Sequence, residues 1–421
     1  MNPILPNNHY VPDAEARVWA DGKMYLYGSY DICKHDFYCS DKYHVFSSSD
    51  LTNWIDHGVS FTAESIPWHN PHWKYLFAPD CLFHNGLYYL YFCMCDGDSG
   101  VASSSSPYGP FKNAVKIEGI DEYQEIDPAV LVDDDNSVYY YWGQHKAKGA
   151  KMLNPSTIDK STLCADLITE EEHGFHEGAS IRKRNGIYYL VYTDVSRGAA
   201  TCLSYATSNS PLGPFKKGGV IINNTDCDAK SWNNHGSIAE FNGQWYIFYH
   251  RSSQRSKYNR RVCVEPIYFN KDGSINEVEM TTQGISNPIN AGITIDAYRA
   301  CILSGSVGSE VTIENGTHNE YLSHIKNGDF VCFKYLDFKD GFSEFEANVS
   351  SVSEGGKIEI RLDNSDGKII GICDIKNTND LQNFINVSCE IEQATGVHSL
   401  YLVFKSNSEY LFNLKSFKFK Y

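Results

Sequence analysis

One phrase recurs along the first two thirds of the chain: a tight-turn dipeptide followed by a strand rich in aromatic residues. The copies begin at Asp21-Gly22, Asn85-Gly86, Asp135-Asn136, Asn185-Gly186 and Asn242-Gly243. An Asn-Gly or Asp-Gly dipeptide between two apolar segments is the strongest short-range signal for a β-hairpin. Successive turns are separated by 64, 50, 50 and 57 residues. Five β units of about 50 residues each predict an all-β fold built around a five-bladed β-propeller.

A second repeated phrase supports this architecture. Residues 106–111 read Ser-Pro-Tyr-Gly-Pro-Phe, and residues 210–215 read Ser-Pro-Leu-Gly-Pro-Phe. Pro and Gly in this arrangement are typical of tight turns, which in a propeller would link the outer strands of a blade. The chain contains no convincing long amphipathic helix.

Polar residues stand at a common distance upstream of the repeated turns. Asp13, Asp127 and Glu177 each lie nine residues before the second residue of their turn, whereas His235 lies eight and Asp80 six residues before it. The innermost strand of each propeller blade lines the central channel. Residues at the same phase of these strands therefore converge at one mouth, and the spacing predicts a ring of four carboxylates and one histidine. The alternative is a set of unrelated surface acids at strand starts.

A ring of carboxylates at one channel mouth is suited to acid/base catalysis. Carboxylates at one channel mouth cannot all ionise independently, because like charges raise the pKa of some and leave others low. Glycoside hydrolysis needs this separation, since one carboxyl group donates a proton while another is ionised. Aromatic residues make up 14% of the chain; they favour β structure and offer rings on which sugars stack, although most are expected in the core.

Charge and hydropathy exclude several other functions. The chain has 52 acidic and 36 basic side chains, a formal charge of −16, which disfavours nucleic acid and anionic membranes as partners. The longest apolar segment, residues 87–95, is too short to span a membrane. A neutral oligosaccharide or polysaccharide is indifferent to this charge. The run Asp133-Asp134-Asp135 is interpreted as a solvated turn.

The cysteine pattern indicates the redox state of the cellular compartment in which the protein works. Thirteen are scattered along 421 residues, and none forms a CxxC pair, so we expect reduced and mostly buried thiols. The N-terminus shows neither the basic nor the apolar segment of a signal peptide. These features predict a protein of the bacterial cytoplasm; a secreted chain whose leader has been removed would look the same. Oligomeric state is not indicated.

The carboxylate motifs carry a family resemblance. The first 290 or so residues resemble glycoside hydrolase family 43, five-bladed propeller enzymes that act mainly on glycans containing arabinose and xylose. The matching segments are residues 2–5, 11–16, 126–130, 176–179, 235–238 and 260–274. The resemblance implies that Asp13 is the general base, Glu177 the general acid and Asp127 the third carboxylate, which orients the acid and tunes its pKa. It also implies inversion at the anomeric carbon, with base and acid about 6.5–9.5 Å apart.

Other residues are candidates for binding. His235 matches the axial histidine that often contacts a calcium ion in the channel through water; the alternative is a hydrogen-bonded histidine without metal, and no cofactor is required for the chemistry. Arg251 and Asp80 are candidates for contacts with substrate hydroxyl groups. Trp73 and Tyr30 are candidate sugar platforms, with a core position as the alternative.

A second domain begins after residues 284–292, which are interpreted as a linker. Alternating segments at 330–335, 357–362 and 398–404 predict a β-sandwich of jelly-roll type. From about residue 296 the chain resembles a family 6 carbohydrate-binding module. Asn413 matches the asparagine of that family's cleft, and His324 and Leu381 occupy the positions of its two aromatic rings. Because leucine has no ring face, we expect weak sugar binding there, with a bracing role as the alternative.

Together these observations predict a propeller catalytic domain at 1–290 and a β-sandwich at 296–421. The predicted function is that of an inverting exo-glycosidase that removes terminal α-L-arabinofuranosyl or β-D-xylosyl units from plant-type oligosaccharides. Two alternatives stay open: another furanosidase, such as a β-D-galactofuranosidase, and a propeller that only binds glycans. The full set Asp13, Asp127 and Glu177 favours an enzyme over a lectin.

Overall fold

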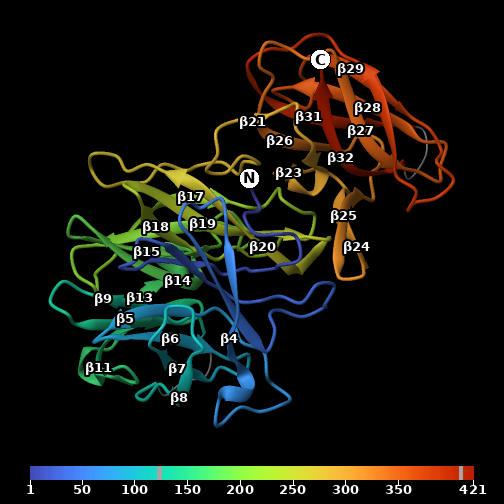
Figure 1. Ribbon diagram of the computed structural model, residues 1–421. Coiled ribbons are helices and arrows are strands. Elements are labelled where there is room, and N and C mark those ends of the chain that lie inside the picture. The colour runs from blue at the N-terminus through green and yellow to red at the C-terminus, as the bar shows by residue number, and fades with distance from the viewer. Residues whose placement is uncertain (121–125, 407–410) are drawn as a thin grey trace.

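The computed structural model describes residues 1–120, 126–406 and 411–421, and it is almost entirely β structure in two successive bodies (Figure 1). The described residues contain one α-helix, α1 (Glu170–His173), and three short 3₁₀ turns at Ala63–Ser65, Lys160–Thr162 and Ala297–Arg299. None of the described helices is long and apolar enough to cross a membrane. The predicted all-β fold, a propeller followed by a β-sandwich, is confirmed.

The first body is the propeller, and its five sheets follow one another along the chain. Its strands are β1 (Glu15–Val18), β2 (Met24–Tyr27), β3 (Lys42–Ser48) and β4 (Ile55–Thr62); β5 (Asp80–His84), β6 (Leu87–Cys93), β7 (Ser99–Ser104) and β8 (Lys112–Lys116); β9 (Ala129–Val132), β10 (Val138–Trp142), β11 (Lys146–Asn154), β12 (Thr157–Ile158) and β13 (Cys164–Thr169); β14 (Phe175–Arg184), β15 (Ile187–Asp194), β16 (Cys202–Ser208) and β17 (Lys216–Asn223); and β18 (Ser237–Phe241), β19 (Gln244–Ser253) and β20 (Ser256–Ile267). The first strands β1, β5, β9, β14 and β18 contact one another in a closed ring. A bridge from Ala14 to Gly236 joins the first blade to the fifth.

The repeated dipeptides are the hairpin turns between the first two strands of each blade. At Asn185-Gly186 and Asn242-Gly243 both residues have positive φ, 52° and 79° in the first pair and 52° and 81° in the second. Two consecutive positive φ values define a type I′ turn, whose twist matches that of the flanking strands. The Gly-Pro turns at 109–110 and 213–214 lie between the third and fourth strands of their blades, as predicted.

The aromatic second strands are buried on both faces. Along β15, Tyr189 and Val191 pack into one hydrophobic cluster, whereas Leu190 and Tyr192 pack into another. Successive side chains of a strand point to opposite faces, and in a propeller each face meets a neighbouring blade. The near-continuous apolar sequence of these strands follows from this double burial.

The second body is a sandwich of two sheets. One sheet has the order β21-β26-β31-β28-β29 with β23 beside β26, and the other has the order β24-β25-β32-β27-β30 with β22 beside β32. The strands are β21 (Ile289–Asn290), β22 (Ile295–Asp296), β23 (Ile302–Leu303), β24 (Gly308–Glu314), β25 (Thr317–Ser323), β26 (Phe330–Asp337), β27 (Glu344–Ser350), β28 (Gly356–Leu362), β29 (Ile369–Ile375), β30 (Ile385–Glu390), β31 (Val397–Lys405) and β32 (Asn413–Lys420). Because β21 already pairs with β26, the predicted boundary at 290 falls inside the sandwich.

The sandwich packs against the fifth blade. Arg261 of β20 and Glu320 of β25 form an ion pair of 2.7 Å whose two side chains are at most 3% exposed. Cys301 and Cys332 of the sandwich belong to a hydrophobic cluster made mostly of propeller residues. A buried ion pair and a shared apolar cluster fit a second domain that braces the propeller.

Candidate active site

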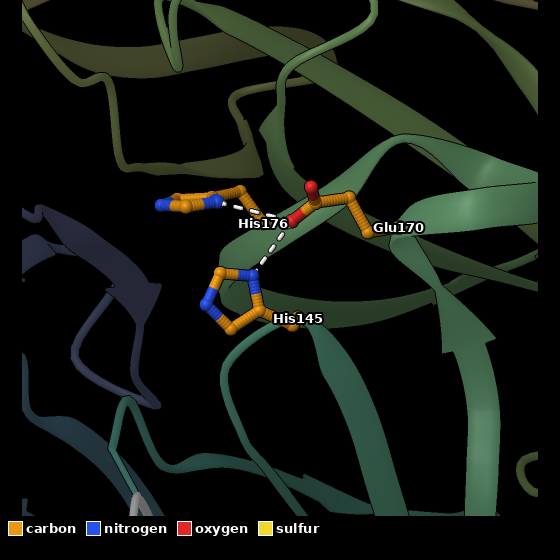
Figure 2. A group of neighbouring side chains, drawn as sticks. All are labelled: His145, Glu170 and His176. Carbon is orange, nitrogen blue, oxygen red and sulfur yellow. Dashed lines mark hydrogen bonds and ion pairs between the residues drawn. The ribbon is translucent and has the colours of Figure 1, made fainter.

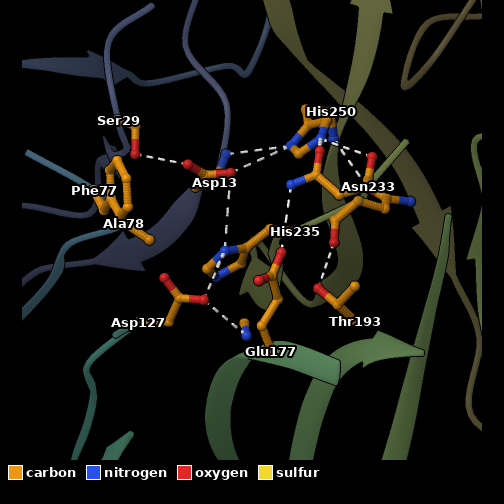
Figure 3. Close-up of polar contacts among 12 residues, drawn as sticks. Asp13, Ser29, Phe77, Ala78, Asp127, Glu177, Thr193, Asn233, His235 and His250 are labelled. Atoms are coloured by element: carbon orange, nitrogen blue, oxygen red, sulfur yellow. Dashed lines mark hydrogen bonds and ion pairs between the residues drawn. The ribbon is translucent and has the colours of Figure 1, made fainter. Parts of the chain in front are cut away.

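Four of the five residues predicted at the channel mouth line one pocket of about 300 Å³. Asp13 precedes β1, Asp127 precedes β9, Glu177 lies at the start of β14 and His235 precedes β18, so four blades contribute (Figure 3). A pocket of this size is at the small end of the range of about 300–1,000 Å³ for ligand sites. It suits a single sugar unit.

The fifth residue, Asp80, does not reach the pocket, and its predicted contact with substrate is wrong. Its carboxylate is fully buried, pairs with the Arg17 guanidinium, and accepts hydrogen bonds from the backbone N–H groups of Cys81 and Val130. Asp80 stands six residues before its turn instead of nine. Phe77 occupies the nine-residue position, and it lines the pocket instead.

Buried ion pairs join the first strands of different blades. Besides the pair of Arg17 with Asp80, Arg182 of β14 lies 2.6 Å from Glu15 of β1. A chain of alternating charges in the interior is stable because each charge has a partner. These side chains link β1 to β5 and to β14 within the ring of first strands.

Asp13 is held as an ion. Its Oδ1 accepts a hydrogen bond of 3.0 Å from Arg260 and its Oδ2 one of 2.6 Å from Ser29. Burial raises the pKa of Asp13, but the charge of Arg260 and the nearby His235 and His250 outweigh burial, so the pKa lies below its ordinary value. An ionised carboxylate beside a pocket can accept a proton from water.

The supporting arginine was not predicted. Arg260 lines the pocket, and its guanidinium also binds Asp31 through Nε and Nη2, at 3.0 and 2.8 Å. Both partners are buried. Arg260 stands in a segment that matches the family, but its partners lie more than 220 residues away in sequence, so only the folded chain shows this role.

The environment of Asp127 raises its pKa, whereas that of Asp13 lowers it. Its Oδ2 accepts a hydrogen bond of 3.0 Å from the backbone N–H of Gly178, and Nδ1 of His235 lies 4.0 Å away. Burial raises the pKa of Asp127 to about 7; His235 opposes this shift, whereas Glu177 and Asp13 add to it. Asp127 and Asp13 both have left-handed backbone, with φ of 59° and 57°, a conformation in which Asp is enriched among non-Gly residues.

Glu177 is the partly exposed member of the three carboxylates. Its Oε2 accepts a hydrogen bond of 3.0 Å from Gln144, and its Oε1 one of 3.5 Å from Asn233. The neighbouring Gly178 N–H binds Asp127. The backbone that carries Glu177 is therefore tied to Asp127, which positions the most accessible carboxyl group at the pocket surface.

Asp127→Asn should stabilise the protein at high pH. The pKa is about 7 in the folded protein and about 4 in the unfolded chain. Between these values the folded state binds the extra proton, so stability falls as pH rises from about 4 through about 7. Asparagine removes this penalty and still accepts the Gly178 hydrogen bond. We expect a gain of about 1–3 kcal/mol at pH 8 that vanishes near pH 4.

Thermal unfolding measured from pH 4 to 8 checks this expectation. Asp36→Asn, at an exposed position, is the control and should leave the pH profile unchanged. A difference between Asp127→Asn and the parent that does not vary with pH would contradict the assigned cause.

Three other predicted binding residues lie outside the pocket. Arg251 is buried and binds the Tyr249 hydroxyl and the Thr281 carbonyl, so its predicted contact with substrate is wrong. Tyr30 stacks on His44 with a centroid distance of 4.4 Å, in agreement with the core alternative. Trp73 is 53% exposed, but the residues that line the pocket do not include it.

The tryptophan that lines the pocket is Trp232, which is 48% exposed. We expect Trp232→Ala to raise KM for oligosaccharides about tenfold, because exposed rings at the centre of a recognition site contribute about 1–2 kcal/mol. Trp73→Ala is the matched control, since that ring is equally exposed but lies outside the pocket. Initial rates on xylo- and arabino-oligosaccharides test both variants, and equal effects would contradict the placement.

His235 fits a calcium ion only through water. Nδ1 of His235 lies 3.8 Å from Asp13 Oδ1, and Asp13 is already bound to Arg260. Calcium takes six to eight oxygen ligands. Among the residues that the structure describes, His235 belongs to no group of three side chains able to hold a metal. Water would therefore supply most of the ligands.

A second cleft, of about 440 Å³, lies in the sandwich and brings together the three residues predicted there: His324, Leu381 and Asn413. Leu381 is 41% exposed. The Asn413 amide donates hydrogen bonds to Ser350 Oγ at 3.3 Å and to the Leu381 carbonyl at 3.5 Å. Leu381 thus offers no ring face at one of the two predicted clamp positions, and the Asn413 amide already has partners within the protein.

A five-bladed propeller, a pocket of about 300 Å³, an arginine-bound carboxylate, a buried carboxyl group of raised pKa and a third, accessible carboxyl group define a glycoside hydrolase. The chain belongs to glycosyl hydrolases family 43: the model of that family matches residues 1–275. The model of the family 6 carbohydrate binding module matches residues 303–421. Both resemblances seen in the sequence are confirmed.

Known relatives agree with this assignment. The chain is 30% identical to a xylosidase/arabinosidase of Thermoclostridium stercorarium over 99% of this chain and 98% of that protein. It is similar to the crystal structure of a family 43 arabinoxylan arabinofuranohydrolase from Bacillus subtilis in complex with cellotetraose, with a TM-score of 0.54 and 27% identity over 100% of this chain and 97% of that one. A β-xylosidase/α-arabinofuranosidase from a compost microbial metagenome, in complex with xylotriose in a calcium-free form, has a TM-score of 0.57 and 32% identity over 66% of this chain and 97% of that one.

Proposed function

We propose that this glycoside hydrolase removes terminal α-L-arabinofuranosyl or β-D-xylosyl units from plant-type oligosaccharides, with inversion. The observation that carries the proposal is the convergence of Asp13, Asp127 and Glu177 on a small pocket of about 300 Å³, which has room for one end unit at a time. The names of the relatives support the choice of pentose.

In the proposed reaction, Asp13 takes a proton from a water molecule, and the water oxygen attacks the anomeric carbon from the face opposite the leaving group. Glu177 gives its proton to the leaving oxygen as the glycosidic bond breaks. The product sugar gains the hydroxyl group, and the remaining glycan gains the proton. Asp127 positions the acid through the Gly178 N–H at 3.0 Å. Arg260 keeps Asp13 ionised until the water binds.

A panel of nitrophenyl glycosides tests the substrate class, and proton NMR of the first product tests the stereochemistry. We expect turnover of the α-L-arabinofuranoside, the β-D-xyloside or both, and initial release of the inverted anomer. Selective turnover of a β-D-galactofuranoside would assign the remaining furanosidase alternative. No turnover of any glycoside, with oligosaccharide binding retained, would identify a glycan-binding propeller instead.

We propose that the sandwich cleft binds sugar weakly. The full-length Asp13→Asn protein should migrate through an arabinoxylan gel with little retardation from this cleft. Adding Asn413→Ala should change the dissociation constant less than about fivefold, because a single exchangeable hydrogen bond contributes about 1 kcal/mol or less. Adding Leu381→Tyr should increase retardation, because it supplies a ring opposite His324. A large loss with Asn413→Ala would contradict weak binding.

We propose that catalysis needs no metal and that any calcium at His235 is structural and bound through water. Asp13 and Glu177 supply both proton transfers in the proposed reaction, which supports this proposal. Activity in the presence of a chelator should stay within about twofold of its value with added calcium, since no proton transfer passes through the ion. A larger loss that calcium restores would overturn the proposal.

We propose that the enzyme works in a reducing compartment, the bacterial cytoplasm. All 13 cysteines are free thiols, and nine of them are buried. Thiol titration of the denatured protein, purified from its natural source under anaerobic conditions, should find all of them reduced. A set of disulfides would contradict this compartment.

A further inference from the structure

Three side chains that the proposed reaction does not use converge beside the pocket (Figure 2). His145 lies between β10 and β11, Glu170 begins α1, and His176 is the second residue of β14. Nδ1 of His145 lies 2.7 Å and Nδ1 of His176 3.3 Å from the same oxygen, Glu170 Oε2. The three ligand atoms all lie within 4.8 Å of one another.

We propose that His145, Glu170 and His176 form a binding site for a divalent transition metal of the zinc type. Two imidazole nitrogens and one carboxylate oxygen, with water in the fourth position, are a common zinc donor set. Imidazole ligands favour zinc, cobalt or nickel over calcium and magnesium, which prefer oxygen. The site does not include His235, although His176 and His235 both line the pocket.

The present distances are close to those of a loaded site. Ligands about 2.0–2.2 Å from a tetrahedral zinc ion lie about 3.3–3.5 Å from one another. The contact between His176 and Glu170, at 3.3 Å, already has this length. The contact between His145 and Glu170, at 2.7 Å, needs an outward shift of less than about 1 Å. Both side chains are free to shift, since they are 53% and 42% exposed.

The backbone holds the three residues together without a metal. The N–H of His145 donates a hydrogen bond of 2.7 Å to the carbonyl of His176, and the N–H of Glu170 donates one of 2.9 Å to the carbonyl of His145. His145 itself has left-handed backbone, with φ of 61°. A site whose ligands are already placed loses little conformational entropy when the ion binds.

The surroundings admit a cation. His145 and Glu170 line an open cavity of about 960 Å³, whose wall also carries Asp166, Glu171 and Glu172. The wall includes two lysines; Lys146 pairs with Asp166 at 2.6 Å, and Lys217 lies 3.7 Å from Asp194. Negative side chains lining a cavity raise the local concentration of cations.

Loading the site would join α1 to two segments of the pocket wall. His145 directly follows Gln144, and His176 directly precedes Glu177, the two residues linked by the hydrogen bond of 3.0 Å. An ion that binds only the folded chain stabilises it. We therefore expect the melting temperature to rise with metal concentration.

Cobalt(II) titration of the full-length protein, with a non-thiol reductant present, tests the proposal. Tetrahedral Co²⁺ bound by nitrogen and oxygen absorbs in the visible range, whereas Co²⁺ bound by thiolate adds a charge-transfer band in the near ultraviolet. We expect the protein to bind one equivalent of Co²⁺ with the visible spectrum of nitrogen and oxygen ligands and without the thiolate band. Glu170→Gln and His145→Gln should each weaken binding at least about tenfold and abolish the rise in melting temperature.

Glu171→Gln is the matched control, because this residue is the next one along α1 but does not belong to the group of three possible ligands. It should bind Co²⁺ like the parent. Circular dichroism of each metal-free variant verifies that it folds. An unchanged affinity in either ligand variant, a spectrum dominated by thiolate bands, or no binding at millimolar Co²⁺ would each overturn the proposal.

Discussion

Asp13→Asn should lower kcat by about 10²–10⁴-fold on every substrate, whatever its leaving group. Asparagine has nearly the same shape but cannot accept a proton from water. The pKa of Asp13 lies below its ordinary value because Arg260 and two histidines outweigh burial, so the parent base is ionised at any pH near neutrality. Steady-state rates on nitrophenyl glycosides and on natural oligosaccharides measure the loss.

Asp31→Asn is the control for this prediction. Asp31 binds the same Arg260 guanidinium, at 2.8 Å, and is equally buried, but it does not line the pocket. Its replacement should reduce stability and lower kcat by less than about tenfold. A loss of less than tenfold in Asp13→Asn, or equal losses in the two variants, would remove Asp13 from the role of base.

The fold could be predicted because it repeats. Each blade carries its own turn dipeptide and aromatic strand, so local signals occur five times and reinforce one another. The nine-residue spacing also placed Asp13, Asp127 and Glu177 correctly, because residues at the same phase of equivalent strands reach the same depth of the channel. Asp80 broke the spacing, and the structure puts Phe77 at the equivalent position.

The rest of the site depends on contacts that no local pattern encodes. Arg260 reaches Asp13 and Asp31 across more than 220 residues of sequence, and the matching segment around it does not reveal these partners. The two candidate tryptophans, likewise, cannot be told apart by a local sequence pattern. Trp73 and Trp232 are similarly exposed, and only the path of their loops places Trp232 at the pocket.

The role of Glu177 as acid can be distinguished from the role of Asp13 as base by how the rate loss of each variant depends on the leaving group. Glu177→Ala should lower kcat/KM by about 10²–10⁴-fold on natural oligosaccharides, whose leaving oxygen needs a proton. A dinitrophenyl leaving group departs as a stable anion without needing a proton. On dinitrophenyl glycosides the loss of kcat/KM should therefore be less than about tenfold.

A plot of log kcat/KM against the pKa of the leaving group measures this difference. Glu177→Ala should show a steep negative slope, because every increase in leaving-group basicity must be met without the acid. Asp13→Asn should be displaced downward with the slope of the parent, because water activation is needed whatever departs. Gln144→Ala removes the amide that donates to Glu177 Oε2 at 3.0 Å but keeps the carboxyl group, so its slope should lie between those of the parent and Glu177→Ala. Parallel lines for Glu177→Ala and Asp13→Asn would show that Glu177 does not donate the proton. The acid would then be Asp127, because burial raises its pKa to about 7 and it can hold a proton near neutral pH.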